Sequence, residues 1–511
     1  MSLQTTGNNA STTELHNSTS SNDNTSTTKK VSRNVYVMLV LCLLWGFSDS
    51  IWTGTIVVAW VQLLAGGANA TNSNSKVGYV EATQGMAMLL TALPVGYIAD
   101  KYSRQLVIRA GGIGFFVATT MTLIAVINPY NWNETFQYYI ILFSMALWGT
   151  GQGIFNGPSQ ALFADSIPKG ERTKWYSRLM MCYMIPSIAG PIAAIILLTY
   201  YGDAWTFNEL RPVFIFGVVA EFPPAVLSMF MRDDLALNNG GDDEDDEDEE
   251  EEDKKDDEQD NATIHNNDQS SQQKRCCSCI TKKSVPYVLF ASSLLTALGS
   301  GMTIKFFPLF FKSSLDLTPR GVQLIYVIVP LLIAIFTKIN EKIATILGRI
   351  QTILLSNIIG VSLLCTMSIL VEFYKINTWY IVVPVYLVRT GIMNSTYALQ
   401  ESVLMDFVPK ETRARWKSLE SVASFGWCGS AVLGGILADA SSYSSTFFYT
   451  AGLQFLGTIV IGLLISVVPI EEKKGTKKKE GDDDDTTTTT HKKDGDNNTF
   501  GTNDLEERLL G

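Results

Sequence analysis

The sequence predicts an all-α integral membrane protein with twelve transmembrane helices in two six-helix bundles. Only 17% of its 511 residues are charged, against roughly a quarter in soluble proteins. Apolar runs of about 20 to 30 residues follow one another, and each is long enough to cross a hydrocarbon layer about 30 Å thick. A highly charged segment separates the first six runs from the last six. This composition excludes a soluble enzyme, so no enzymatic activity is expected.

Polar segments flank and divide the apolar part of the chain. Residues 1–33, 232–284 and 470–511 are rich in Ser, Thr, Asn, Asp or Glu and have too few apolar residues to form a core. We therefore expect a disordered N-terminal tail, a disordered acidic linker and a disordered C-terminal tail. The bundles are then residues 34–231 and 285–469.

Twelve apolar runs are predicted as helices, each ending at a turn or a group of charges. The first bundle holds 34–64, 77–99, 104–127, 136–165, 173–200 and 208–231. The second holds 285–311, 320–346, 350–372, 378–407, 414–438 and 444–469. An even number of spans puts both tails on one side, and Lys and Arg favour the connections on that side by roughly five to one. Both termini and the linker are therefore predicted to be cytoplasmic.

The two halves contain a repeat at an offset of 241 residues. The pattern D-x-x-P-K-x-x-R-x-[KR]-W-x-S follows the fourth helix and again the tenth. Its members are Asp165, Pro168, Lys169, Arg172, Trp175 and Ser177, and then Asp406, Pro409, Lys410, Arg413, Trp416 and Ser418. The repeat predicts duplicated halves of the same orientation, as in transporters whose substrate site lies between two such bundles.

The connection between the second and third helices carries a motif. It reads Gly96, three residues, and then Asp100, Lys101, Tyr102, Ser103, Arg104 and Gln105. This resembles the G-x-x-x-D-[RK]-x-G-[RK]-[RK] signature of the major facilitator superfamily, except that Ser103 and Gln105 replace the usual glycine and basic residue. With the two-bundle layout, the resemblance covers nearly all of residues 34–470. No subfamily is assignable, because Gly190-Pro191 lacks the Gly-Gly that follows in many antiporters of the family.

The resemblance implies that helices 1, 4, 7 and 10 line a central cavity. It also implies a latch that holds the cytoplasmic ends of the halves together, centred on the signature aspartate. The latch residues expected here are Gly96, Asp100, Lys101, Arg104, Asp165, Arg172, Asp406 and Arg413.

Three ionisable side chains lie at the predicted mid-depth of the membrane, where a charge is costly and usually faces a cavity or a partner. Asp49 and Arg389 lie on helices of different halves that the resemblance places at the cavity. They could neutralise each other as a static pair, or they could bind substrate or a coupling ion. Glu221 is expected to be protonated or paired locally. Other charges are expected to extend to the membrane surface, namely Glu81, Arg109 and Lys305.

Two cavity helices also have a polar face. Gln152, Asn156 and Gln160 are spaced by four residues, which aligns three amides on one side of the fourth helix. The tenth helix carries Asn394, Tyr397 and Glu401, of which the last two match Asn156 and Gln160 at the repeat offset. These faces suit a hydrated substrate path, although hydrogen bonding between helices would explain any single amide equally well.

Cys276, Cys277 and Cys279 lie beside basic residues just before the seventh helix, which suits reversible palmitoylation. A metal site would need more ligands than one C-x-x-C provides, so no metal or other cofactor is expected.

The function predicted is that of a secondary transporter, which moves a small solute by alternating access. Proton coupling through Asp49 or Glu401 and uniport are both open. The rival interpretation is a membrane receptor or scaffold of the same fold that signals through its cytoplasmic linker. We expect the partners to be a small-molecule substrate and the lipid bilayer, together with protons if transport is proton-coupled. No nucleic acid is expected, and the chain is expected to be monomeric. The host membrane is the plasma membrane or an endomembrane such as that of the vacuole or lysosome.

Overall fold

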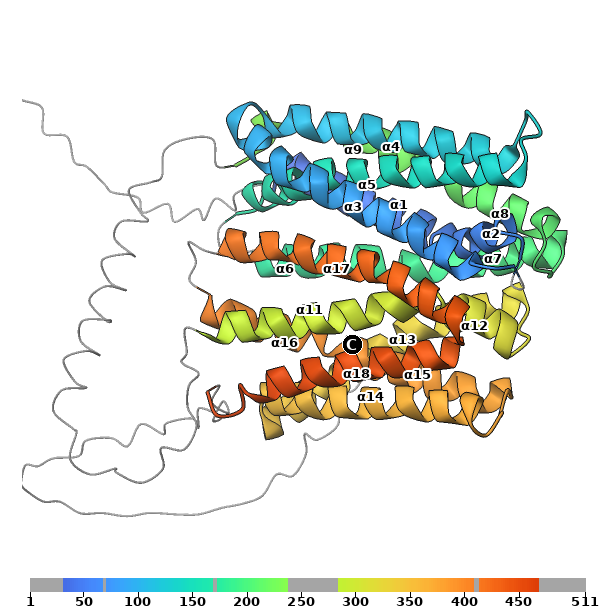
Figure 1. Ribbon diagram of the computed structural model, residues 1–511. Helices are drawn as coiled ribbons and strands as arrows, with labels where there is room; N and C mark the ends of the chain where they lie inside the picture. The colour runs from blue at the N-terminus through green and yellow to red at the C-terminus, as the bar shows by residue number, and fades with distance from the viewer. Residues whose placement is uncertain (1–30, 68–69, 169–171, 238–283, 409–412, 468–511) are drawn as a thin grey trace, which may run out of the picture. The chain divides into compact units, whose positions relative to one another are not determined.

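A computed structural model describes residues 31–67, 70–168, 172–237, 284–408 and 413–467. Within them the first half forms nine helices that lie alongside one another (Figure 1). Their bounds are α1 (Arg33–Trp52), α2 (Ile56–Leu64), α3 (Ser73–Lys101), α4 (Arg104–Ile127), α5 (Glu134–Asp165), α6 (Arg172–Met184), α7 (Pro186–Tyr201), α8 (Phe207–Val219) and α9 (Phe222–Ser228). A short 3₁₀ turn, Asp233–Leu235, follows.

The second half forms eight helices among the described residues, with breaks at partly different places. Their bounds are α11 (Val285–Ile304), α12 (Phe307–Ser314), α13 (Pro319–Leu347), α14 (Arg349–Glu372), α15 (Trp379–Ser395), α16 (Tyr397–Phe407), α17 (Arg413–Ala440) and α18 (Tyr443–Gly462). We call the end of the bundle that holds residues 31–33, 237 and 284 the proximal end. The opposite end, with the connections at 202–206, 315–318 and 441–442, is the distal end (Figure 1).

The all-α membrane fold class is confirmed. Ten segments among the described residues are long and apolar enough to cross a membrane. The twelve-helix architecture is completed by α5 and by the pair α15 and α16. These two are not among the ten apolar segments, and they carry the amides and charges that the sequence predicted for a polar path.

Five helices that were predicted to be continuous are instead broken, so those predictions are wrong in detail. Proline explains three breaks, because it removes a backbone donor: Pro186 opens α7, Pro223 and Pro224 lie in α9, and Pro308 follows the gap between α11 and α12. Gly54 lies in the gap between α1 and α2. At the last break, the Thr396 hydroxyl donates to the carbonyl oxygen of Met393.

Small residues let α3 and α17, which belong to different halves, approach closely. A Cβ atom added to Gly78 would overlap the backbone of Ala431, and one added to Gly85 would overlap Cys428. Nearer the distal end, Gly435 meets the backbone of Asn74 in the same way. The two halves are therefore in backbone contact from the distal end to about the middle of α3.

Candidate functional site

The second half contains an open cavity of about 580 Å³. Residues of α11, α12, α14, α15, α16, α17 and α18 line it. Four of them are site residues predicted from the sequence: Arg389, Asn394, Tyr397 and Glu401. The volume lies within the range usual for small-molecule sites, so the cavity is the natural candidate for a substrate site.

Arg389 is 7% exposed. Its Nη2 atom donates to Oε1 of Gln454 on α18 at 3.1 Å, and its guanidinium carbon lies 5.9 Å from the centre of the Phe307 ring. The Gln454 amide in turn donates to the Ser300 hydroxyl at 3.0 Å. Nε of Arg389 is buried without a hydrogen-bond partner. The arginine is thus positioned by a neutral amide and an aromatic ring.

Asp49 has a different set of neighbours, all outside this cavity. Its carboxyl group lies beside that of Glu221 and within electrostatic reach of Lys305. Glu221 is fully buried and accepts a hydrogen bond from Nε1 of Trp52 at 3.0 Å. Among the described residues, then, Asp49 meets another acid and not Arg389, so the static pair considered from the sequence does not form in this structure. Local pairing of Glu221 does occur.

Lys305 does not extend to the membrane surface, and that prediction is wrong. Its side chain is 17% exposed and its Nζ atom forms an ion pair with Oε1 of Glu81 at 2.6 Å. It also donates to the carbonyl oxygen of Thr53 at 3.5 Å. Lys305 lies at the break between α11 and α12, and Thr53 at the break between α1 and α2. The lysine therefore joins the two halves at equivalent helix breaks.

Glu81 likewise points inward, being 7% exposed, which corrects its placement at the surface. Arg109 is exposed and donates to the carbonyl oxygen of Met229, as a side chain at the membrane surface can. Sequence position alone could not place Lys305 or Glu81, because their depth depends on where the helices break. The proline at 308 was the available signal.

The polar face of α5 lies apart from the cavity. Gln152 accepts a hydrogen bond from the Gln84 amide on α3 at 3.2 Å, which is the helix-to-helix alternative. Asn156 and Gln160 are exposed. These amides are not among the residues that line the cavity.

A polar cluster that the sequence did not reveal closes the distal end. The Asp439 carboxylate, at the end of α17, accepts hydrogen bonds from the backbone N–H groups of Asn74 and Ser75 at 3.0 and 2.8 Å. It also accepts from the Asn74 amide and the Ser75 hydroxyl at 2.9 and 2.6 Å. Because these residues begin α3, the carboxylate occupies the positive end of that helix dipole. The Tyr443 hydroxyl adds a bond to Oδ1 of Asn74 at 2.7 Å.

Two similar ion pairs lie at the proximal end, one in each half. Arg104 at the start of α4 pairs with Asp165 at the end of α5. Arg349 at the start of α14 pairs with Asp406 at the end of α16 at 2.6 Å. The repeated aspartates thus hold each half together. Of the other predicted latch residues, Lys101 lies over the rings of Tyr97 and Tyr102.

A Cβ atom added to Gly96 would meet nothing within 4 Å. The side chains of Asp100, Arg172 and Arg413, and the cysteines Cys276, Cys277 and Cys279, lie outside the described residues.

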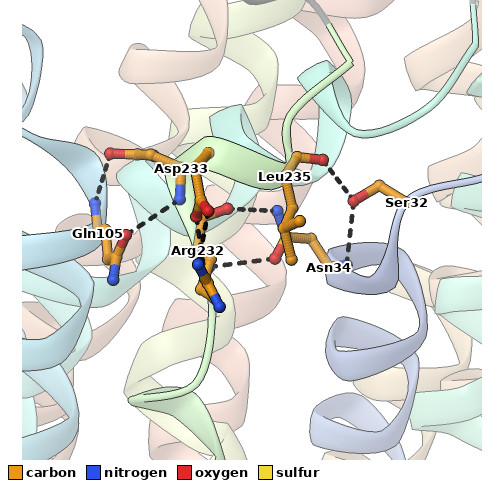
Figure 2. Close-up of polar contacts among 7 residues, drawn as sticks. Ser32, Asn34, Gln105, Arg232, Asp233 and Leu235 are labelled. Carbon is orange, nitrogen blue, oxygen red and sulfur yellow. Dashed lines mark hydrogen bonds and ion pairs between the residues drawn. The ribbon is translucent and has the colours of Figure 1, made fainter.

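The two departures from the family signature share one partner, Asp233, which follows the last helix of the first half. Its carboxylate accepts from the Ser103 hydroxyl at 3.0 Å and from the Gln105 backbone N–H at 2.9 Å. Oε1 of Gln105 accepts from the backbone N–H of Asp233 at 3.3 Å (Figure 2). Alongside, the Asn34 side chain bonds to both backbone groups of Arg232. The chain is therefore attached to the starts of α1 and α4 where it leaves this half.

Comparison with solved structures returns transporters. A bacterial homologue of the iron transporter ferroportin, in an inward-facing state, is 12% identical, with a TM-score of 0.60 over 84% of this chain and 98% of that one. A D-xylose–proton symporter is 14% identical, with a TM-score of 0.59 over 85% and 97%. The nucleoside transporter NupG is 11% identical, with a TM-score of 0.53 over 85% and 99%. At these identities the likeness establishes the fold.

A comparison with curated protein sequences returns no match. The sequence model of the Major Facilitator Superfamily, however, matches residues 50–249 and 289–502, most of the chain and both of its halves. Together with the fold, this match means that the chain belongs to the Major Facilitator Superfamily of transporters.

Proposed function

We propose that this chain moves a small solute across a membrane by alternating access between its two halves. The observation that supports this most directly is where the halves meet. Polar contacts between described side chains of the two halves are numerous between the middle of the bundle and its distal end. They include Glu81 with Lys305, Asn74 and Ser75 with Asp439, Gln62 with Lys312, Asp203 with Arg320, and Trp205 with the backbone of Leu317.

Such an arrangement suits one end state of an alternating cycle. Polar contacts of this kind can be exchanged for water when the ends separate, whereas a continuous apolar interface would resist opening. Two of the similar solved structures are described as inward-facing, the ferroportin homologue and the xylose transporter XylE from E. coli. With its proximal end taken as cytoplasmic, this chain has the corresponding form, closed on the outer side.

A disulfide across the distal end tests this cycle. The Ser75 hydroxyl and the Asp439 carboxylate are 2.6 Å apart, so Ser75→Cys with Asp439→Cys should oxidise to a bridge that holds this end shut. In a background without the native cysteines, Ala297→Cys in the cavity reports access. A membrane-impermeant maleimide should label it from both sides under reducing conditions, but only from the proximal side after oxidation. Each single distal cysteine is the matched control.

Labelling from the distal side that is unaffected by oxidation would exclude alternating access through this interface. The rival role, a receptor or scaffold of the same fold, would then gain weight.

Proton coupling is the second part of the proposal, and Asp49 and Glu221 are its candidate carriers. Two neighbouring carboxylates repel each other inside a protein, so such a pair tends to share one proton. Infrared difference spectra should contain the C=O band of a protonated carboxyl group, and Glu221→Gln should remove or shift it. Glu134→Gln at the start of α5 should leave it unchanged. A spectrum without that band, or a band insensitive to Glu221→Gln, would favour uniport.

A further inference from the structure

The charge of Arg389 has no acidic partner among the described residues. A guanidinium group has five N–H donors, and the Arg389 group uses one in a hydrogen bond, to the neutral amide of Gln454. Its Nε atom is buried without a partner. A lone buried cation is costly at the depth of a membrane, so it calls for a role beyond packing.

The nearest acids among the described side chains are engaged or distant. Glu81 pairs with Lys305, and Asp49 lies beside Glu221 in the other half. Glu401 lines the same cavity, but it comes twelve residues after Arg389. At 1.5 Å per residue this separation is roughly 18 Å along α15 and α16. The positive charge therefore remains available to whatever enters the cavity.

The surroundings of Arg389 indicate what that occupant is. Thr390 is 8% exposed, and its hydroxyl is buried at the cavity wall beside Tyr386. Phe307, Tyr386 and Trp427 give the cavity aromatic walls. Arg389 is the single cation among the residues that line the cavity in the described part of the chain. One guanidinium, a neighbouring hydroxyl and aromatic walls match one negative charge on an apolar body.

We infer that this cavity binds an organic monoanion, a carboxylate with an apolar body, whose oxygens accept hydrogen bonds from the Arg389 guanidinium and the Thr390 hydroxyl. Arginine suits this role because its planar fork of donors fits both oxygens of a carboxylate. A phosphate dianion would leave one charge uncompensated, since Arg389 is the one cation among the described lining residues. The inference names the substrate class of the proposed transporter, and so it rests on that function.

Binding to the purified full-length protein tests it. The probes are phenylacetate and hexanoate, each with its uncharged amide, together with inorganic phosphate. The readouts are the unfolding temperature and the fluorescence of tryptophan, because Trp427 lines the cavity. Both carboxylates should raise the unfolding temperature and change the fluorescence, whereas the amides and phosphate should do neither at the same concentration.

Variants assign the effect to this site. Arg389→Gln should weaken phenylacetate binding by about tenfold or more, as expected for loss of a hydrogen-bonded charge. Arg389→Lys should retain part of it. Thr390→Val should weaken it by about fivefold, because it removes one hydroxyl donor while keeping the shape of the side chain. The matched control is Arg211→Gln on α8, which also removes an arginine with a buried, unpartnered Nε atom but lies outside the cavity.

The inference is overturned if neither carboxylate binds, if the amides bind equally well, or if phosphate alone binds. The inference is also overturned if Thr390→Val and Arg389→Lys both bind phenylacetate with the affinity of the wild type. These two variants decide the matter if Arg389→Gln does not fold. The binding measurements need no movement of the halves. Carboxylate binding that depends on Arg389, with labelling of Ala297→Cys that ignores the distal disulfide, would keep the site and reject the transport cycle. Labelling that the distal disulfide blocks, without carboxylate binding that depends on Arg389, would support the transport cycle and reject the anion site.

Discussion

Three sets of buried charges among the described residues differ in their physical situation. Lys305 and Glu81 have opposite charges and meet at 2.6 Å across the two halves. Asp49 and Glu221 are acids that lie side by side within one half. Arg389 faces a cavity with a neutral amide as its hydrogen-bond partner. The first arrangement suits a contact between the halves, the second a proton site, and the third an anion site, so each proposal rests on a different residue set.

The Lys305–Glu81 pair should be energetically coupled. Either Lys305→Gln or Glu81→Gln leaves the other charge buried, and should lower the free energy of unfolding by about 3 kcal/mol. The double variant should lose clearly less than the sum of the two, as a double-mutant cycle in detergent would reveal. Lys338 and Glu341, whose ion pair is exposed, are the matched control, and the same substitutions there should have little effect. Additive losses at Lys305 and Glu81 would mean that their contact contributes nothing.

At the scale of helices, carboxylates at helix N-termini recur in two different settings. Asp233 accepts from the Gln105 backbone N–H at the start of α4, within the first half. Asp439 accepts from two backbone N–H groups at the start of α3, across the halves. A carboxylate at such a position is favourable by up to about 2 kcal/mol. The same local interaction therefore stabilises a single half in one case and the distal contact between halves in the other.

Asp439→Asn and Asp233→Asn should consequently have different effects. Asp439→Asn should shift the population toward states that are open at the distal end, by up to about tenfold for a loss of 1.4 kcal/mol. Distal labelling of Ala297→Cys should rise accordingly. Asp233→Asn should lower the unfolding temperature but leave that labelling rate unchanged. A rise in distal labelling with both variants would show that the effect is general loosening of the fold.

At the scale of the whole molecule, the two halves repeat their proximal ion pairs but differ in their interiors. Arg104–Asp165 and Arg349–Asp406 occupy equivalent places, whereas the cavity of about 580 Å³ lies in the second half. Trp148 precedes Arg389 by the repeat offset of 241 residues, and it is a buried residue that donates to the Thr122 hydroxyl. The two halves thus share this frame, whereas one of them carries the cation.

The contribution of Asp203 to closure of the distal end should be lost only in acid. Partial burial raises the pKa of its carboxyl group, but hydrogen bonds from the Arg320 backbone N–H and guanidinium outweigh this and hold the pKa below its ordinary value. A lowered pKa means that the contact is fully present above the pKa of the unpaired acid, about 3.9, and is lost as the pH falls through the lowered value. Because Asp203 stays ionised in that range, distal labelling of Ala297→Cys should be constant between about pH 7 and pH 5.

Asp203→Asn removes the charge at every pH and should raise distal labelling already at neutral pH. Arg320→Gln should have the same effect, because it removes the other side of the pair. The control is Glu134→Gln, because Glu134 begins α5 near the same end of the bundle. It should leave distal labelling unchanged. If the Asp203→Asn protein labels at the wild-type rate, the Asp203–Arg320 contact does not contribute to closure.

The sequence by itself determined the membrane fold, the two halves, the repeat and the family. These depend on the length and apolarity of runs and on local motifs, which need no knowledge of distant contacts. It also identified Arg389, Asn394, Tyr397 and Glu401, which lie near one another along two successive helices and do line one cavity. The fold and part of the site can thus be predicted from local sequence patterns.

Only the tertiary structure decided which charges meet. Asp49 was a reasonable candidate to pair with Arg389, yet it lies beside Glu221, because the rotation of each helix and the breaks at residues 53–55 and 305–306 set which side chains share a level. The same breaks bring Lys305 to Glu81 rather than to the membrane surface. Asp439 likewise contacts the start of α3, although Asn74 and Ser75 are 365 and 364 positions away from it in the sequence. Such contacts depend on the packing of whole helices, for which a single sequence holds no local signal.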